Sequence, residues 1–173
     1  KPSRWQGFGQ EQIINIIIQE GWENGSRPEG RAKMSGIGCC SKTRAYFLAK
    51  SQGFNTVHGR MPSVTTGANM VNKDLSFIAV SGDVDTASIG VGQFIHPTRR
   101  NLGMVYIIQN DGVYVLKERQ YSANVEKGAK KKKVAPNEHA PLYLLAIAVH
   151  LGCTVAARVY PARKQTFNCL DRK

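Results

Sequence analysis

The stretch Leu75-Ser76-Phe77-Ile78-Ala79-Val80, continued by Ser81-Gly82-Asp83-Val84-Asp85, decides the fold of this chain. Its first half is apolar at nearly every position, which is typical of a strand buried on both faces of a parallel sheet. Its second half consists mostly of small and acidic residues that favour a turn. The stretch therefore predicts a central parallel strand that ends in two aspartates.

A second strand of this kind is predicted over Met104-Val105-Tyr106-Ile107-Ile108, and Gln109-Asn110-Asp111-Gly112 follows it. The carboxyl ends of parallel strands lie at one edge of the sheet, where ligands bind in open α/β folds. Asp83 and Asp111 are 28 positions apart, enough for one crossover between neighbouring strands. Oxygen ligands favour Mg²⁺ or Ca²⁺, and Mg²⁺ commonly bridges carboxylates to phosphates. Aspartates after strands also serve as turn or helix-cap residues, and the spacing leaves that alternative open.

Helical and extended patterns alternate along the chain, which indicates an open, mostly parallel α/β sheet with helices on both faces. Helices are predicted over Gln10–Trp22, Thr43–Gln52, Ser63–Asn72, Ser88–Arg100 and Pro141–Leu151, and further strands over Lys33–Gly38 and Thr154–Val159. Pro97 is expected to kink its helix or end it early. We expect a loop at Asn24–Gly30, a linker at Ser122–His139, and a single domain over residues 1–173.

The chain is strongly basic, with 24 basic and 12 acidic residues and a formal net charge of +12. Four of these charges form the run Lys130-Lys131-Lys132-Lys133. Such a run favours a solvated loop, with a phosphate-contacting or docking role as the alternative. Aromatic residues do not alternate with basic ones and no nucleic-acid motif matches. Small anions or an acidic protein are therefore the expected partners, rather than nucleic acid.

Cysteine content and hydropathy bear on the compartment. The four cysteines are Cys39, Cys40, Cys153 and Cys169. They lack the density of a disulfide scaffold and suit a reducing compartment. No apolar run approaches the length that crosses a bilayer, and no export signal is recognisable. We therefore expect a cytoplasmic protein without membrane contact.

Taken together, the motifs resemble the β subunit of the 2-oxoacid:ferredoxin oxidoreductases, in which Gly-Asp-x-Asp and a later Asn-Asp/Asn-Gly bind thiamine pyrophosphate. The resemblance runs from about Trp5 to Arg158. The matching stretches are Gly36-Ile37-Gly38-Cys39, Gly53-Phe54, His58-Gly59-Arg60, Gly82–Asp85, Phe94-Ile95-His96, Arg99-Arg100-Asn101, Asn110–Tyr114 and Gln120-Tyr121-Ser122. It implies a thiamine diphosphate-binding fold of the pyrophosphate type.

The resemblance also assigns roles to residues. It implies Mg²⁺ ligation by the side chains of Asp83 and Asp111 and by the backbone carbonyl of Val113. The residues expected against the cofactor are Ile37, Gly38, Cys39, Cys40, His58, Gly82, Val84, Asp85, Val115 and Leu116. Lys42 is a candidate for neutralising a phosphate or a substrate carboxylate, with a plain surface lysine as the alternative. Two positions depart from the family, because Asp111 stands where asparagine is usual and Val84 replaces a glycine.

The iron–sulfur ligands of the family are largely missing. Members commonly bind a [4Fe–4S] cluster through four cysteines, and two of them belong where this chain has Trp5-Gln6-Gly7-Phe8-Gly9. Cys39 matches the third ligand position and is the lone remnant of such a site. Thr166-Phe167-Asn168 lies closer to Arg158 than in the family and no cysteine precedes it, so we expect a shortened or gapped region after about residue 159. A cluster bound by this chain is not expected.

The resemblance implies an enzyme that oxidatively decarboxylates a 2-oxoacid of the pyruvate or 2-oxoglutarate class. It implies a hetero-oligomer, in which an α-type subunit carries the pyrimidine-binding domain and the activating glutamate. No catalytic residue is then expected in this chain, with His58 and Lys42 as auxiliaries. Coenzyme A and ferredoxin, or a similar acceptor, are the other expected partners. The alternatives are a subunit of a non-oxidative thiamine pyrophosphate-dependent decarboxylase and a non-catalytic protein that binds anions or nucleic acid through its lysine run.

Overall fold

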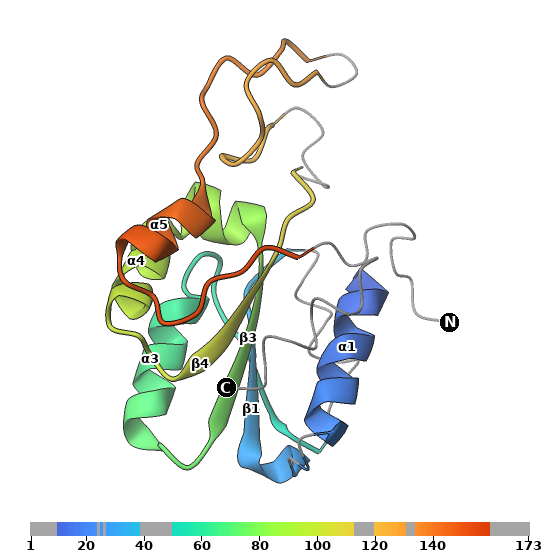
Figure 1. Ribbon diagram of the computed structural model, residues 1–173, viewed down its shortest axis with the longest axis vertical. Helices are drawn as coiled ribbons and strands as arrows, with labels where there is room; N and C mark the ends of the chain where they lie inside the picture. Colours follow the sequence, from blue (N-terminus) through green and yellow to red (C-terminus); the bar gives the residue numbers. More distant parts are fainter. Residues whose placement is uncertain are drawn as a thin grey trace.

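The computed structural model describes residues 10–23, 25, 27–38, 50–112, 120–130 and 134–159. Its centre is a parallel sheet of four strands in the order β2-β1-β3-β4 (Figure 1). The strands are β1 (Arg31–Ser35), β2 (Gln52–Asn55), β3 (Ser76–Gly82) and β4 (Met104–Gln109). In β3, Val80 is paired with Ser35 on one side and with Ile107 on the other. The predicted central strand and open parallel sheet are therefore confirmed.

The side chains of β3 alternate between two apolar cores, one on each face of the sheet, as the period of two in a strand requires. One core consists of Ile13, Ile14, Ile17, Ile78 and Val80. The other consists of Ala32, Met34, Met61, Phe77 and Ala79. Because both faces of β3 are buried, the strand is apolar at almost every position.

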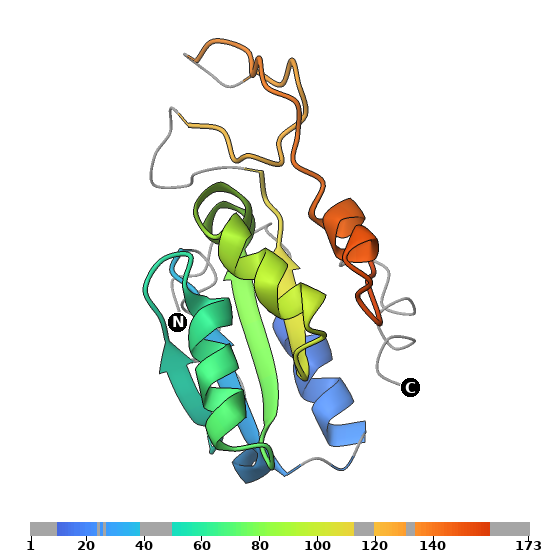
Figure 2. The same cartoon turned by 90° about the vertical axis from the view of Figure 1, so that its left-hand side faces the viewer.

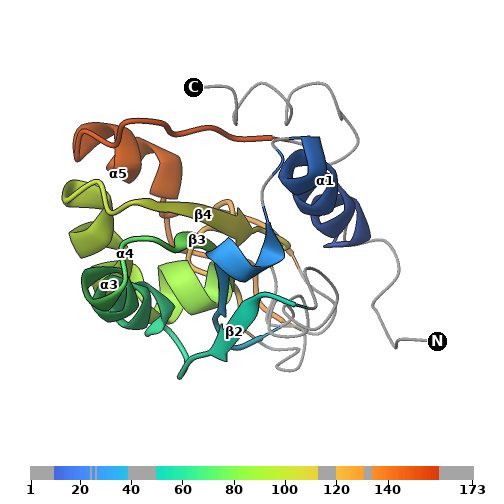
Figure 3. The ribbon, with the colours of Figure 1, turned by 90° about the horizontal axis from the view of Figure 1, so that it is seen from below.

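Helices cover both faces, as predicted. Helix α1 (Gln10–Glu23) packs on one face, while α3 (Met61–Val71) and α4 (Val91–Arg99) lie on the opposite side (Figure 3). Helix α5 (Leu144–His150) packs against α4 (Figure 2). A short 3-10 helix, η1 (Pro28–Gly30), leads into β1. Within the described residues, none of the helices combines the length and apolar character that a membrane span requires.

The two strands on the β2 side of the sheet differ from the prediction. β1 covers Arg31–Ser35 rather than Lys33–Gly38. β2 was not predicted, and Gln52 begins this strand instead of ending a helix over Thr43–Gln52. The part of that helix prediction before Lys50 lies outside the described residues. β2 is a four-residue edge strand with mostly exposed side chains, so it has no buried apolar pattern to reveal it.

The predicted helix over Ser88–Arg100 is divided at Gly90. A π-helical turn, η3 (Val84–Ile89), precedes α4. A Cβ atom at Gly90 would lie 2.7 Å from the backbone oxygen of Asp85 and 2.8 Å from that of Gly59, so only glycine fits this approach. Of the two outcomes expected for Pro97, an early end of the helix is not found, because α4 continues through the buried proline to Arg99. A kink at Pro97 stays a prediction.

The strand predicted over Thr154–Val159 is wrong, since these residues form no strand. The side chain of Asn101 holds this part of the chain instead. Its Nδ2 donates to the Gly152 carbonyl at 3.0 Å, and its Oδ1 accepts from the Thr154 backbone N–H at 2.8 Å. The asparagine adopts a left-handed φ of 48°, which this residue type tolerates better than most. Because these backbone groups are engaged by a side chain, they do not extend the sheet.

Residues 120–130 and 134–142, here called the arm, extend beyond the carboxyl edge of the sheet (Figures 1 and 2). Buried Asn137 organises the arm, because its Nδ2 donates to the carbonyls of Val125 at 2.9 Å and Glu126 at 3.2 Å. The backbone N–H of Leu142 donates to the Ala123 carbonyl at 2.8 Å. This tie explains why α5 begins at Leu144 rather than at the predicted Pro141.

Asn137→Ala is expected to loosen the arm without unfolding the sheet. Each lost hydrogen bond contributes about 1 kcal/mol, so the protected N–H groups of Gly128 and His139 should exchange with solvent about 10-fold faster or more. Hydrogen exchange followed by NMR measures this change. Asn15→Ala, at an exposed position of α1, is the matched control. Equal exchange in the arm of both variants would contradict the role given to Asn137.

Candidate functional site

The four parallel strands end at one edge of the sheet, and the predicted site residues that the structure describes lie at these strand ends or in the loops that follow them. These loops are Gly36–Gly38 after β1, Thr56–Arg60 after β2, Asp83–Asp85 after β3 and Asn110–Gly112 after β4. The carboxyl edge of an open α/β sheet is the usual place for a ligand.

The side chain of Asp83 has a carboxylate oxygen that a cation would bind. The residue is 2% exposed, and its Oδ2 has no hydrogen-bond partner. It directly follows Gly82, which is paired with Gln109 of β4. A buried carboxylate oxygen without a partner is costly, since water no longer solvates it. A metal ion is the kind of ligand that removes this cost, so the structure fits the predicted role of Asp83.

Asp111 stands two residues beyond the end of β4, next to Asp83 in the order of the strand ends. It is half-buried, and Gly112 after it has a left-handed φ of 70°. Among the described residues no three His, Cys, Asp or Glu side chains form a complete metal site. Mg²⁺ commonly takes only one or two carboxylates and completes its shell with water and ligand phosphates. Two aspartates therefore suit a metal that is held jointly with a diphosphate.

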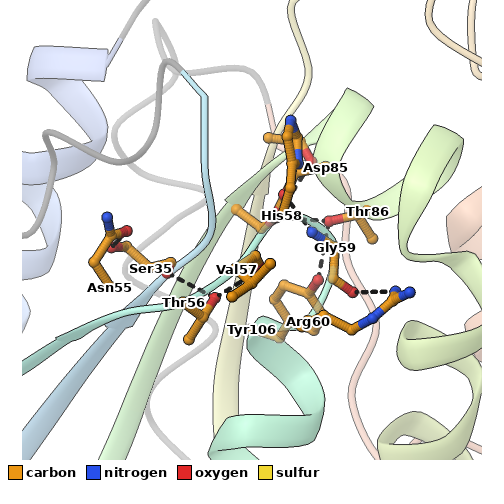
Figure 4. A network of polar contacts seen from close by, with 12 residues as sticks. Ser35, Asn55, Thr56, Val57, His58, Gly59, Arg60, Asp85, Thr86 and Tyr106 are labelled. Atoms are coloured by element: carbon orange, nitrogen blue, oxygen red, sulfur yellow. Dashed lines mark hydrogen bonds and ion pairs between the residues drawn. The ribbon is translucent and has the colours of Figure 1, made fainter.

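Asp85 differs from Asp83, because protein groups occupy its carboxylate (Figure 4). Its Oδ1 accepts from the Gly59 N–H at 2.7 Å and from Nδ1 of His58, and its Oδ2 accepts from Ser81 at 2.6 Å. Gly36 covers it so closely that a Cβ there would lie 1.8 Å from Oδ2. Asp85 thus ties together the loops after β1, β2 and β3. A cofactor contact by Asp85 stays a prediction. Because protein groups occupy its carboxylate, its backbone would make such a contact.

A row of buried hydroxyl groups continues from Asp85 into the fold. Thr86 donates to Ser81 at 2.9 Å, and Ser81 in turn donates to Asp85. The hydroxyl of Thr86 is also 2.9 Å from that of Tyr106 on β4 (Figure 4). The contacts among these three hydroxyl groups were not predicted. No pattern in the sequence indicates them, because the three residues come together only in the folded sheet.

His58 is half-buried, and its side chain is 36% exposed. Nδ1 contacts Asp85, so Nε2 on the other side of the ring is turned away from this carboxylate. Among the described residues, no hydrogen bond or ion pair to Nε2 is found. The structure thus places His58 at the same edge as Asp83 and holds its ring in one orientation. A contact between His58 and the cofactor stays a prediction.

Two further polar groups at this edge were not predicted. The side-chain oxygen and nitrogen of Gln109 are buried without a hydrogen-bond partner. The hydroxyl of Ser122 in the arm is likewise buried and unpartnered, and the neighbouring Ala123 N–H donates to Ser88 of η3 at 3.0 Å. Unsatisfied buried groups of this kind are uncommon in native proteins, which marks both residues as candidate ligand contacts.

The structure describes only some of the other predicted site residues. Ile37 is exposed, Gly38 has a φ of 133°, and Val84 is half-buried at the start of η3. The predictions for Cys39, Cys40, Lys42, Val113, Val115 and Leu116 lie outside the described residues. Within the described part of the chain, Cys153 is a free, half-buried thiol.

Comparison with known proteins gives consistent matches. Residues 36–172 match the family model of the C-terminal TPP-binding domain of thiamine pyrophosphate enzymes. The chain is 36% identical to 2-oxoacid:ferredoxin oxidoreductase subunit beta of Sulfolobus sp. over 155 residues, which cover 89% of the chain and 51% of that protein. It is 40% identical to 2-oxoglutarate oxidoreductase subunit KorB of Mycobacterium tuberculosis over 126 residues, covering 72% and 33%.

A solved structure has the same fold. The 2-oxoglutarate:ferredoxin oxidoreductase of Magnetococcus marinus, solved with 2-oxoglutarate, coenzyme A and succinyl-CoA bound, superimposes with a TM-score of 0.90 at 28% identity. The superposition covers 98% of this chain and 58% of that one. The chain thus spans about half the length of the curated β subunits that align along most of it.

Proposed function

This chain belongs to the thiamine pyrophosphate enzymes, because it matches their C-terminal cofactor-binding domain. From that premise we propose that it binds the diphosphate of the cofactor through Mg²⁺. The unpartnered, buried Oδ2 of Asp83 at the carboxyl edge carries the proposal. Asp83 and Asp111 supply the carboxylates, and the backbone carbonyl of Val113 is the third protein ligand. Gly82, Val84 and the turn after β1 lie against the diphosphate.

The reaction we propose is oxidative decarboxylation of a 2-oxoacid of the pyruvate or 2-oxoglutarate class. Thiamine pyrophosphate, when bound, supplies the nucleophilic carbon and the electron sink for this chemistry. The likeness to β subunits of 2-oxoacid:ferredoxin oxidoreductases supports the substrate class. Electrons pass to ferredoxin or a similar acceptor, and coenzyme A takes the acyl group. The basic surface of the chain, with its net charge of +12, suits these anionic partners.

The site requires a second subunit. The family model that matches here is the C-terminal TPP-binding domain of thiamine pyrophosphate enzymes. We propose that an α-type partner supplies the pyrimidine-binding domain and the glutamate that activates the cofactor. The chain is then inactive by itself and works in a hetero-oligomer.

A second candidate function is non-oxidative decarboxylation of a 2-oxoacid by the same site. The absence of cysteines in Trp5-Gln6-Gly7-Phe8-Gly9 favours it, because that segment matches the start of the family's cluster site. We propose that this chain contributes no [4Fe–4S] cluster. Iron content and the visible absorption band of the purified complex separate the two candidates.

The experiment that tests the Mg²⁺ grip is a calorimetric titration of thiamine pyrophosphate into the full-length subunit purified with its partner. Binding is expected with Mg²⁺ and absent with EDTA. Asp111→Asn should keep the affinity within about 3-fold, because an amide oxygen still ligates Mg²⁺ and one negative charge beside the diphosphate is removed.

A quadruple variant in which Lys130-Lys131-Lys132-Lys133 is replaced by serines is the control for non-specific anion binding. It should bind the cofactor as the wild type does. Loss of binding in this variant, with EDTA having no effect, would instead favour a general anion-binding protein.

A further inference from the structure

We propose that His58 is a catalytic residue of the thiamine pyrophosphate site proposed above, in which Nε2 accepts the proton of the coenzyme A thiol. Asp85 is its positioning residue. The inference rests on the proposed function and adds a proton acceptor to a chain that otherwise only holds the cofactor.

The contact between His58 and Asp85 fixes which ring nitrogen carries the proton. A carboxylate only accepts hydrogen bonds, so Nδ1 of His58 must be the donor in this pair. In the neutral imidazole the other nitrogen then has a free lone pair. Because Nε2 points away from Asp85, the lone pair is directed out of the protein network and is available to a ligand.

Asp85 is itself held rigidly, as a positioning residue must be. It is 2% exposed, and it accepts from the Gly59 N–H at 2.7 Å and from Ser81 at 2.6 Å. Ser81 is held in turn by Thr86, whose hydroxyl is paired with that of Tyr106. This chain of buried contacts leaves the carboxylate little freedom to rotate, and with it the imidazole ring.

The position of His58 separates it from the metal ligands. It follows β2, whereas Asp83 follows β3 and Asp111 follows β4, with β1 between β2 and β3. Strands are spaced about 4.8 Å apart, so the histidine stands to one side of the metal along the same edge. A ligand whose diphosphate is held between β3 and β4 can extend toward it.

The proposed step is a proton transfer. The S–H bond of coenzyme A breaks, its electron pair stays on sulfur, and the proton forms a bond to Nε2. The resulting imidazolium keeps its Nδ1–H directed at Asp85, whose carboxylate stabilises the positive charge. No oxidant or further reactant takes part.

Nitrogen-15 NMR of the full chain with labelled histidines tests the orientation without reference to activity. The chain has four histidines, and the ring signals of His58 are identified by their loss in His58→Asn. Two-bond couplings should show the proton on Nδ1 in the wild type and on Nε2 in Asp85→Asn. A wild-type His58 protonated on Nε2 when neutral would overturn the proposal.

Two substitutions of His58 separate catalysis from structure. The amide of His58→Asn can replace Nδ1 as a donor to Asp85 but offers nothing at the place of Nε2. We expect His58→Asn to keep the melting temperature and cofactor affinity while kcat of the assembled enzyme falls roughly 100-fold, the usual scale for a proton-transfer group. Asp85→Asn should lower kcat by about 10-fold or more. Wild-type kcat in His58→Asn would show that the pair is structural only.

Two arms of the kinetic assay test whether the thiol is the proton donor. In His58→Asn, turnover with coenzyme A should be reduced, whereas turnover of the oxoacid without coenzyme A should equal that of the wild type. Equal reduction in both arms, or reduction in neither, contradicts the proposal. If the wild type binds no thiamine pyrophosphate, the proposed function fails, and the NMR result then decides on the histidine alone.

Discussion

Asp83→Ala is expected to weaken Mg²⁺-dependent binding of thiamine pyrophosphate at least about 100-fold, which is about 2.8 kcal/mol. The same substitution should make the protein without metal and cofactor more stable. Both effects have one cause, since Oδ2 of Asp83 is buried without a hydrogen-bond partner. A cation satisfies this oxygen, and without the cation its burial costs free energy.

The gain in stability of the metal-free protein should be about 1–3 kcal/mol, the cost of an unsatisfied buried polar group. Urea unfolding of metal-free protein measures it, and calorimetry measures cofactor binding. Asp74→Ala is the matched control, because Asp74 is exposed before β3 and its substitution should change neither quantity. A variant that is destabilised and still binds the cofactor would contradict the metal-ligand role of Asp83.

Gly36→Ala is the second substitution with a large expected effect. The new Cβ would lie 1.8 Å from Oδ2 and 2.8 Å from Cγ of Asp85. Hydrogen bonds from His58, Gly59 and Ser81 hold this carboxylate, so it cannot move without losing them. Overpacking together with lost hydrogen bonds should cost about 2–4 kcal/mol of the free energy of unfolding.

Gly67→Ala provides the comparison, because nothing lies within 4 Å of a Cβ at that position of α3. Alanine is preferred to glycine in a helix, so this variant should gain about 0.5–1 kcal/mol. Urea unfolding measures both variants. Similar free energies of unfolding for the two would contradict the close contact between the loop after β1 and Asp85.

The sequence predicts β3 and β4 well, because both carry continuous apolar runs, and in β3 the run is buried on both faces of the sheet. It also predicts that Asp83 and Asp111 follow neighbouring strands. It fails for β2, whose short, exposed edge strand has no such pattern. It also fails for Thr154–Val159, which forms no strand and whose first residue, Thr154, donates its N–H to the side chain of Asn101.

The sequence does not show that Asp83 and Asp85 have different roles. Asp83 and Asp85 look alike there, two residues apart after one strand. In the folded protein Asp83 has an oxygen left for a ligand, whereas Asp85 binds His58 and Gly59, which are 27 and 26 residues away. Such long-range contacts depend on how β1, β2 and β3 pair, and no local pattern encodes them.

These contacts also explain why glycines surround Asp85. Gly36 passes over its carboxylate, and Gly59 and Gly90 approach each other beside it. The backbone is packed tightly here so that one buried carboxylate can join three loops. At the carboxyl edge, protein groups therefore hold the carboxylate of Asp85, whereas Oδ2 of Asp83 has no hydrogen-bond partner.

Binding of thiamine pyrophosphate through Mg²⁺ is best tested by measuring thiamine pyrophosphate, magnesium and iron together in the full-length subunit purified with its partner. We expect one thiamine pyrophosphate and one Mg²⁺ for each copy of this chain, and no iron bound by the chain itself. A preparation that contains iron but neither thiamine pyrophosphate nor magnesium would contradict it.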